Sequence, residues 1–522
     1  MIKKQAIEEF LNRDLQNYDW IKDIEVEELD NAIEELGFKT ELRLTMRTHQ
    51  KAAFYICACT DNFILHLDMG LGKTVISLLL FEFHKKFSGA KKMLTVVPNT
   101  VNIKNWEEQI KEFTDFKPVM LYGTASQRLD LLRSEGDIYI INYEGLPVLT
   151  TSLQKTGKSK KRKKIYDPEL ANEFVNSFDM IVLDEIHKTK NRKSLTYEIC
   201  NEICKRTELR YGLTGTPLGR NPIDLWSQFH LIDRGETLGT SITKYTQAFF
   251  NSKPGYFGGM DYILDKKKEP ILQNFIKNKS IYYADKECGD LPEQIFINRH
   301  VSMSKEAVKE LAVAKAKAKE LSIEREIGST KETMNLYNRA RQICSGFVYE
   351  KVSDDAKDKI AIRFPNNEKL DELEEILEQV PDGNQALVFY HFEESGNMIK
   401  DRLTKLKVKH VFCKGKSMVN DYERFKQDKK IKVLVINIDS GSTGLNLQNA
   451  SYCIYYEPID NPITYKQSLK RIHRDGQKAE RVYYYYLLVA SSVEEHIYGF
   501  LKEGLDMSKK MLEGNKSLED FL

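Results

Sequence analysis

Long apolar runs are missing from this sequence. Its 522 residues contain no stretch of about 18 uninterrupted apolar residues, the usual minimum for a membrane-spanning helix. The first ten residues, MIKKQAIEEF, mix bases with acids, which argues against a secretory signal peptide. We therefore expect an intracellular protein that has no membrane partner.

Cysteine is sparse, and its eight positions are mostly singletons. Cys57 with Cys59, and Cys200 with Cys204, are closely spaced, but neither pair has a matching second half at the spacing of a zinc site. This pattern argues against a zinc module and against a disulfide framework. We expect reduced, structural thiols, as in a reducing compartment.

Proline and glycine are also few, with 13 and 28 residues, and neither sign of charge dominates. The 79 Lys and Arg residues against 77 Asp and Glu residues give a formal net charge of +2. A uniformly basic nucleic-acid coat is excluded, so any polyanion site must come from local clustering. With 41% apolar and 30% charged residues, the chain is predicted to be globular, with about two to four domains.

The hydrophobic pattern predicts an α/β fold with two parallel-sheet lobes. Residues 1–45 are charged and helix-patterned, and we interpret them as an accessory helical segment. Over 46–225, apolar runs such as FILHL and MIVLD alternate with amphipathic stretches, which is typical of strands joined by crossover helices. The alternation fades over 226–350, a predicted all-helical insertion, and resumes over 351–490. A helix and tail are expected over 491–522.

A basic low-complexity segment lies at 153–164. It contains seven cations, Lys155, Lys158, Lys160, Lys161, Arg162, Lys163 and Lys164. Two interpretations carry equal weight: a solvated loop, or a contact to the DNA backbone. A nuclear import signal is a less favoured third.

A glycine-rich string, DMGLGKT over 68–74, follows the predicted strand FILHL and precedes the predicted helix VISLLLF. In this context backbone N–H groups close around phosphates, and the helix N-terminus adds positive potential. Lys73 is placed to reach the β- and γ-phosphates, and the Thr74 hydroxyl to ligate Mg²⁺. Leu67 stands where the full pattern has glycine. The predicted phosphate-binding residues are Met69, Gly70, Leu71, Gly72, Lys73 and Thr74.

Two adjacent carboxylates, Asp184 and Glu185, end a second buried-type strand in the string IVLDEIH. Ligand groups gather at the carboxyl ends of strands in such sheets. Asp184 is predicted to hold Mg²⁺, and Glu185 to orient and deprotonate the water that attacks a phosphoanhydride. An isolated Asp-Glu pair would more often cap a helix. The phosphate loop about 110 residues earlier favours hydrolysis.

His187 completes the string DEIH, which resembles the DExH box of helicase superfamily two. Upstream of the phosphate loop, MRTHQ over 46–50 is similar to the family's L-R-x-x-Q element. This resemblance implies ATP as the nucleotide, with contacts from Arg47 and with Gln50 as the adenine reader.

Three further strings follow in the family's order: LTGTP over 213–217, STGLNL over 442–447 and QSLKRIHRDGQ over 467–477. The last string narrows the resemblance to the Swi/Snf-like double-stranded DNA translocases. The resemblance assigns Gly444 to nucleotide binding. It assigns to coupling or to the DNA side His187, Thr214, Thr216, Ser442, Thr443, Gln467 and Gln477.

Arg471 and Arg474 are spaced one turn apart on a predicted helix of the second lobe. A planar cation delivered across a cleft to the γ-phosphate can stabilise the charge of the transition state. We therefore predict both arginines to be catalytic, together with Lys73, Asp184 and Glu185.

The resemblance implies two RecA-like parallel-sheet lobes with helical insertions between them, an ATP site in the cleft between the lobes, and a C-terminal brace helix. It implies an ATP- and Mg²⁺-dependent translocase on double-stranded or branched DNA. The expected settings are replication, recombination or repair, with replication or repair proteins as possible partners of a monomer. Two alternatives stay open: a strand-separating helicase, and a non-catalytic DNA-binding clamp or replication loading partner.

Some positions depart from the family pattern. Asp439 stands where an arginine often precedes the fifth motif, and YYADK over 282–286 replaces a basic run. The sequence shows no module of the kinds that read histones. We therefore expect a compact prokaryotic or phage-type member in the cytoplasm, and a nuclear location is less favoured.

Overall fold

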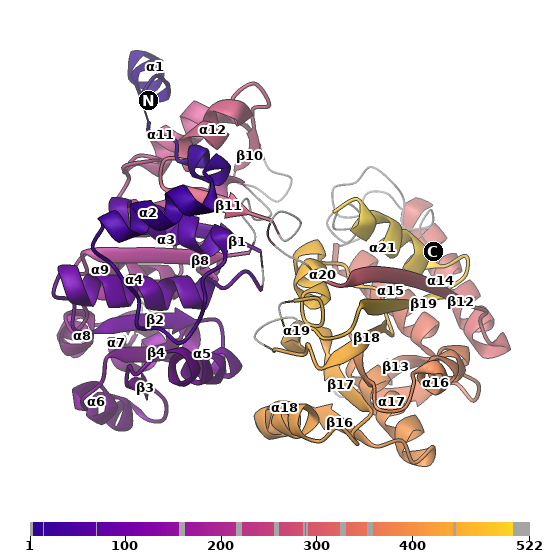
Figure 1. The fold of residues 1–522 in the computed structure, drawn as a ribbon. Coiled ribbons are helices and arrows are strands. Elements are labelled where there is room, and N and C mark those ends of the chain that lie inside the picture. The colour runs from indigo at the N-terminus through magenta and orange to yellow at the C-terminus, as the bar shows by residue number, and fades with distance from the viewer. Residues whose placement is uncertain are drawn as a thin grey trace. The chain divides into compact units, whose positions relative to one another are not determined.

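The computed structural model describes residues 4–13, 15–68, 70–155, 162–215, 222–254, 260–284, 288, 291–323, 330–351, 359–441, 445–474 and 476–504. The chain divides into two compact units, residues 1–289 and 290–522. Each unit is built around a parallel sheet covered by helices, as Figure 1 shows. The expected pair of parallel-sheet lobes is confirmed. No helix in the described ranges has the length and apolar character that crossing a bilayer requires.

Unit 1 contains a seven-stranded sheet in the order β11-β1-β8-β7-β2-β4-β3. Strands β1, β2, β4 and β7 are buried along their whole length, because their Val-, Ile- and Leu-rich runs face helices on both sides. The strand bounds are β1 Phe63–Leu67, β2 Met93–Val97, β3 Pro118–Met120, β4 Ile138–Asn142, β7 Met180–Asp184, β8 Leu209–Thr214 and β11 Ser280–Tyr283.

Successive residues of these strands enter two different cores, as a period of two requires. Phe63 and Leu65 pack in one cluster with α3, α4 and α5, and Ile64 packs in the other with α7 to α10. The helix bounds are α3 Thr48–Thr60, α4 Lys73–Phe87, α5 Thr100–Phe113, α6 Ala125–Arg133, α7 Leu146–Thr150, α8 Pro168–Val175, α9 Leu195–Cys204, α10 Leu225–Asp233, α11 Ile242–Phe249 and α12 Glu269–Ile276.

The N-terminal segment is part of unit 1 and not an appendage to it. Its elements are α1 Lys4–Leu11, the 3-10 helix η1 Asp19–Asp23 and α2 Val26–Glu35. Leu29 and Ile33 of α2 are buried in the same cluster as α3 and α4. The rings of Phe38 and Phe54 lie 4.9 Å apart between their centroids. The described helices of the predicted accessory helical segment over 1–45 thus pack into the core of unit 1.

The expected all-helical insertion over 226–350 is wrong, because this range supplies edge strands to both sheets. Strand β11 pairs with β1 in unit 1, and β12 Glu293–Val301 pairs with β19 in unit 2. Two antiparallel hairpins also involve this range, β9 Phe250–Pro254 with β10 Met260–Leu264, and β13 Phe347–Lys351 with β14 Lys359–Arg363. Edge strands are short or alternately exposed, so they lack the continuous apolar runs of central strands.

The basic segment over 153–164 lies in a hairpin where a loop was one expectation. Strands β5 Thr151–Lys155 and β6 Arg162–Tyr166 pair antiparallel, with Gln154 opposite Lys163. Lys163 and Lys164 are exposed. Residues 156–161, with several of the predicted cations, lie outside the described residues.

Unit 2 contains a six-stranded parallel sheet in the order β12-β19-β18-β15-β17-β16. The remaining strands are β15 Gln385–Tyr390, β16 His410–Cys413, β17 Val433–Asn437, β18 Ala450–Tyr455 and β19 Arg481–Val489. The helices are α14 Lys305–Ile323, α15 Thr330–Ser345, α16 Glu368–Gln379, α17 Glu393–Lys405, α18 Met418–Gln427, α19 Ile438–Gly441, α20 Pro462–Leu469 and α21 Val493–Lys502. Val493 and Ile497 of α21 pack with α14 and α15.

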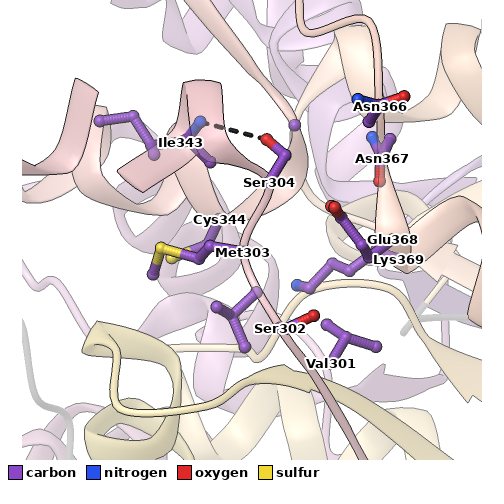
Figure 2. A pocket seen from close by; sticks show the side chains of 13 residues that line it. Val301, Ser302, Met303, Ser304, Ile343, Cys344, Asn366, Asn367, Glu368 and Lys369 are labelled. Carbon is purple, nitrogen blue, oxygen red and sulfur yellow. Dashed lines mark hydrogen bonds between the residues drawn. The ribbon is translucent and has the colours of Figure 1, made fainter. Parts of the chain in front are cut away.

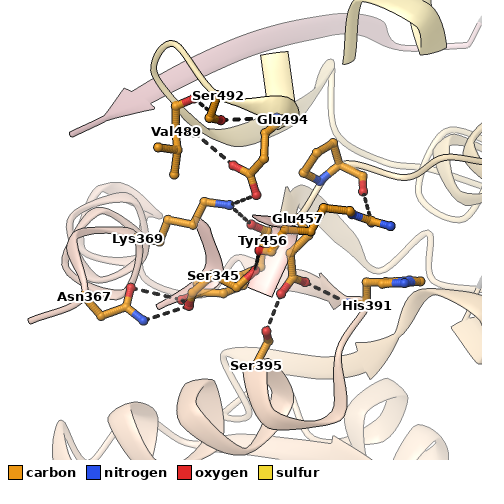
Figure 3. A network of polar contacts seen from close by, with 12 residues as sticks. Ser345, Asn367, Lys369, His391, Ser395, Tyr456, Glu457, Val489, Ser492 and Glu494 are labelled. Atoms are coloured by element: carbon orange, nitrogen blue, oxygen red, sulfur yellow. Dashed lines mark hydrogen bonds and ion pairs between the residues drawn. The ribbon is translucent and has the colours of Figure 1, made fainter. Parts of the chain in front are cut away.

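A buried polar network holds the connection from β18 to α20 (Figure 3). Lys369 of α16 donates to Tyr456 O at 2.9 Å and forms a 2.5 Å ion pair with Glu494 of α21. Arg341 of α15 donates to Pro458 O at 2.9 Å and to Asp460 at 2.7 Å. The segment that leads into α20 is therefore held by α15 and α16, and α21 holds the Lys369 side chain. Beside Lys369, a cavity of about 10 Å³ has room for about one water molecule (Figure 2).

Candidate active site

The loop between β1 and α4 has the backbone that phosphate binding requires. Gly70 and Gly72 have φ angles of +93° and +80°. A Cβ on residue 72 would lie 2.2 Å from Gln50 Nε2, so a side chain at this position would also collide. Lys73 begins α4, and its ammonium group donates to Leu67 O at 3.0 Å. Met69 lies outside the described residues.

The N-terminus of α3 holds this loop from one side. Gln50 accepts a hydrogen bond from Arg47 N at 3.0 Å and donates to Leu71 O at 3.4 Å. His49 Nε2 also lies 3.0 Å from Leu71 O. Gln50, predicted to read adenine, thus also braces the phosphate loop. His49 was missed from the sequence, although it stands directly before Gln50 in the MRTHQ string.

Asp184 ends β7 with its side chain only 8% exposed. Its Oδ2 accepts a hydrogen bond from the indole N–H of Trp106 at 3.1 Å, and its main-chain carbonyl accepts one from the Tyr143 hydroxyl at 3.0 Å. Burial raises the pKa of Asp184, and the adjacent Glu185 carboxylate adds to the rise, whereas Lys73 opposes it. Trp106 and Tyr143 were not predicted as site residues.

Glu185 has a left-handed backbone with a φ angle of +50°, which is uncommon for a residue with a side chain. His187 Nδ1 lies 3.2 Å from Glu185 Oε2 and 3.4 Å from the Thr214 hydroxyl oxygen. The predicted base, the histidine of DEIH and the threonine of LTGTP therefore form one chain of polar contacts. Thr216 lies outside the described residues.

These groups share one edge of the unit 1 sheet. Strands β1, β8 and β7 are neighbours, with His66 opposite Thr214 and Asp184 opposite Leu213. Their carboxyl ends therefore bring together the phosphate loop, the two carboxylates and Thr214. The positive-φ glycines, the helix N-terminus, an ammonium group, the Thr74 hydroxyl and the buried carboxylates fit a nucleoside triphosphate with Mg²⁺.

The expectation that Arg471 and Arg474 share a helix is wrong, because α20 ends at Leu469. Arg471 is 2% exposed, and its guanidinium donates to Leu445 O at 2.9 Å and to Gln467 O at 3.0 Å. These acceptors direct the side chain inward. In this structure Arg471 holds together the segments of the fifth and sixth predicted motifs.

Arg474 is less buried and donates to the side-chain oxygen of Asn446. Gln477 donates to Ala450 O at 2.8 Å and to Ile472 O at 2.9 Å, and Gln467 is buried. The described residues of the two motifs are thus brought together within unit 2. The predicted residues Ser442, Thr443 and Gly444 lie outside the described residues.

The order of these sites along the chain matches two known domain families. Residues 16–346 match the SNF2-related domain, and residues 368–476 match the helicase conserved C-terminal domain. The chain belongs to the SNF2-related family. The Swi/Snf-like resemblance of the motifs is therefore confirmed. The match of this SNF2-related chain begins at residue 16 and includes η1 and α2, which pack into unit 1.

Relatives of the SNF2-related chain include two bacterial proteins. It is 24% identical over 485 residues to the uncharacterized ATP-dependent helicase MG018 of Mycoplasma genitalium, covering 90% of this chain and 42% of the relative. It is 26% identical over 471 residues to the putative ATP-dependent helicase/translocase YwqA of Bacillus subtilis, covering 87% of this chain and 45% of the relative. The chain thus spans less than half the length of these two relatives.

A solved structure, the Sulfolobus solfataricus SWI2/SNF2 ATPase core in complex with dsDNA, is 22% identical to the SNF2-related chain. The likeness covers 91% of this chain and 94% of that one, with a TM-score of 0.40.

Proposed function

We propose that the protein hydrolyses ATP in the presence of Mg²⁺ and uses the reaction to move along DNA. The observation that carries the proposal is the meeting of the phosphate loop, Asp184, Glu185 and Thr214 at one edge of the unit 1 sheet. Family membership supports it, as do the names of two relatives, which are an ATP-dependent helicase and an ATP-dependent helicase/translocase.

The residues of unit 1 take separate roles in this proposal. Backbone N–H groups of the glycine loop and the Lys73 ammonium hold the phosphates. Thr74 and Asp184 would hold Mg²⁺, which would neutralise phosphate charge. Glu185 orients the attacking water and accepts its proton. The polar contacts from Glu185 through His187 to Thr214 give the hydrolytic residue a link to the strand β8 that leads into LTGTP.

Unit 2 supplies Arg474 in this proposal. Its guanidinium is held by Asn446 within the fifth-motif segment, and we assign it to the charge that develops on the transferred phosphoryl group. Arg471 donates from two of its guanidinium nitrogens to backbone carbonyls, so we assign it to holding the segment that carries Arg474.

For the finer function we propose translocation on double-stranded or branched DNA by a monomer, in replication, recombination or repair. The experiment is ATP turnover with single-stranded, double-stranded, forked and four-way DNA in parallel, together with a strand-displacement assay. We expect duplex-containing DNA to stimulate turnover most, without displacement of a simple duplex. Displacement would favour a strand-separating helicase. If the wild-type chain turned over ATP no faster than a Lys73→Ala control, a non-catalytic DNA clamp would be favoured.

A further inference from the structure

We propose that Trp106 is a positioning residue for the metal-binding carboxylate of Asp184. Its indole N–H fixes the orientation in which that carboxylate receives Mg²⁺. The inference rests on the proposed function, because it needs Asp184 to hold the metal. It adds a residue from α5, which lies outside the motifs that the sequence indicated.

The hydrogen bonds at Asp184 carry the argument. The carboxylate accepts a hydrogen bond from the Trp106 indole N–H at 3.1 Å. A hydrogen bond from a buried side chain of another element restricts the rotation of a carboxylate group, which a solvated carboxylate retains. Trp106 is itself 2% exposed and packs in the core with Ile103 and Ile110 of α5. Its N–H is therefore held in place by packing.

The main chain of Asp184 is fixed in the same manner. Tyr143, 5% exposed, donates its hydroxyl to the carbonyl of Asp184 at 3.0 Å. Tyr143 begins the segment after β4, and α5 follows β2. Aromatic donors from two neighbouring connections thus hold both the peptide and the side chain of one residue.

Indole suits this task because it is a donor only and does not titrate in the physiological range. A donor to the ligating carboxylate removes rotational freedom that metal binding would otherwise have to remove. Outer partners of metal ligands commonly change metal affinity by about 10- to 100-fold when replaced. If Trp106 only filled the core, its replacement by phenylalanine would leave the Mg²⁺ affinity nearly unchanged, because phenylalanine would preserve most of the packing.

The first experiment compares Trp106→Phe with Trp226→Phe in the full chain. Trp226 is a matched control, since its buried indole N–H also donates, to Gly239 O at 2.9 Å. We expect Trp106→Phe to raise the Mg²⁺ concentration for half-maximal ATP turnover by about tenfold or more, with little change in metal-free nucleotide binding. Trp226→Phe should leave the Mg²⁺ midpoint unchanged. An unmoved midpoint in Trp106→Phe would overturn the inference.

The second experiment does not depend on turnover or on the folding of Trp106→Phe. The chain has three tryptophans, so Trp20→Phe with Trp226→Phe leaves Trp106 as the sole reporter. Titration with Mg²⁺ in the presence of a non-hydrolysable ATP analogue should change its emission, and Asp184→Asn in that background should abolish the change. A flat titration in a chain that turns over ATP would overturn the inference. Absence of Mg²⁺-dependent turnover in the wild type would instead overturn the proposed function.

Discussion

Arg471 donates to the main-chain carbonyl of Leu445 at 2.9 Å from a side chain that is only 2% exposed. The same guanidinium donates to Gln467 O at 3.0 Å, and Leu447 N donates back to Arg471 O at 3.1 Å. The segment after α20 and the segment 445–447 are therefore joined in both directions. Because Arg471 is enclosed in this way, its main role is to stabilise the structure of unit 2.

Arg471→Ala should therefore mainly lower stability, whereas Arg474→Ala should mainly lower ATP turnover. Loss of Arg471 leaves buried carbonyls unsatisfied, so unit 2 should lose about 2–4 kcal/mol of unfolding free energy. Arg474→Ala should keep that stability and lower kcat by about 10³, the scale of arginine-finger effects, with little change in DNA affinity. Calorimetry and steady-state ATP turnover measure the two effects. Wild-type melting of Arg471→Ala would contradict the structural role given to it.

Lys73→Ala and Glu185→Gln should separate nucleotide binding from hydrolysis. Lys73 supplies positive charge to the phosphates, so its loss should weaken ATP binding by about tenfold or more. Glu185→Gln should retain binding and lower kcat by about 10²–10⁴, because the general base is removed. Equilibrium binding of a fluorescent ATP analogue and DNA-stimulated turnover provide the test. Near-normal turnover in Glu185→Gln would exclude it as the base.

Removal of one partner of the Lys369–Glu494 ion pair should lower the unfolding free energy much more than replacement of both partners by apolar residues. Both side chains are buried, at 1% and 0% exposure, and burial raises the pKa of Glu494. Lys369→Met alone leaves a buried carboxylate without its cation and should destabilise unit 2 by about 3–5 kcal/mol. Lys369→Met with Glu494→Leu should recover most of that loss. A double-mutant cycle by calorimetry tests this, and additive losses would contradict it.

Acid should destabilise unit 1 through His66. Burial lowers the pKa of this β1 histidine from 6.5 to about 3, with Lys73 contributing. Between these values the unfolded chain binds a proton that the folded chain does not. The unfolding free energy therefore falls as pH falls below 6.5, by about 1.4 kcal/mol per pH unit.

Between pH 6.5 and 5, His66→Leu should reduce the pH dependence of the unfolding free energy by about 1.4 kcal/mol per pH unit. Urea unfolding followed by tryptophan emission reports on unit 1, because Trp20, Trp106 and Trp226 all lie there. Asp184 titrates in both chains, so the difference between them isolates His66. Equal slopes for the two chains would show that His66 does not carry the effect.

The basic hairpin provides a salt-dependence test. If Lys163 and Lys164 contact phosphates, their replacement by Gln should weaken binding to all duplex sequences and reduce the log-log salt slope by about 0.9 per lost contact. Lys91 and Lys92 form a matched control pair, since they precede β2 at the amino edge of the sheet, opposite the candidate site. Equal slopes of log binding constant against log salt concentration for wild type and the Lys163/Lys164 variant would favour a solvated hairpin.

The phosphate loop, the DEIH strand and the parallel sheets could be predicted from the sequence, because each depends on local signals. A glycine string between a strand and a helix, and a run of five buried residues ending in carboxylates, are complete within a few positions. Edge strands β11 and β12 were missed for the opposite reason. Strand β11 has only four residues and most of β12 alternates exposed with half-buried residues, and both become strands because β1 and β19 offer hydrogen-bonding edges.

Only the tertiary structure revealed the partners of the predicted catalytic residues. Trp106 reaches Asp184 across 78 positions and Tyr143 reaches it across 41. Arg471, predicted to reach the γ-phosphate, instead donates to Leu445 O across 26 positions and is buried. Periodicity and motif spacing describe a residue's own element. Hydrogen bonds between elements depend on where the sheet places the strand ends, and that is decided by packing of the whole unit.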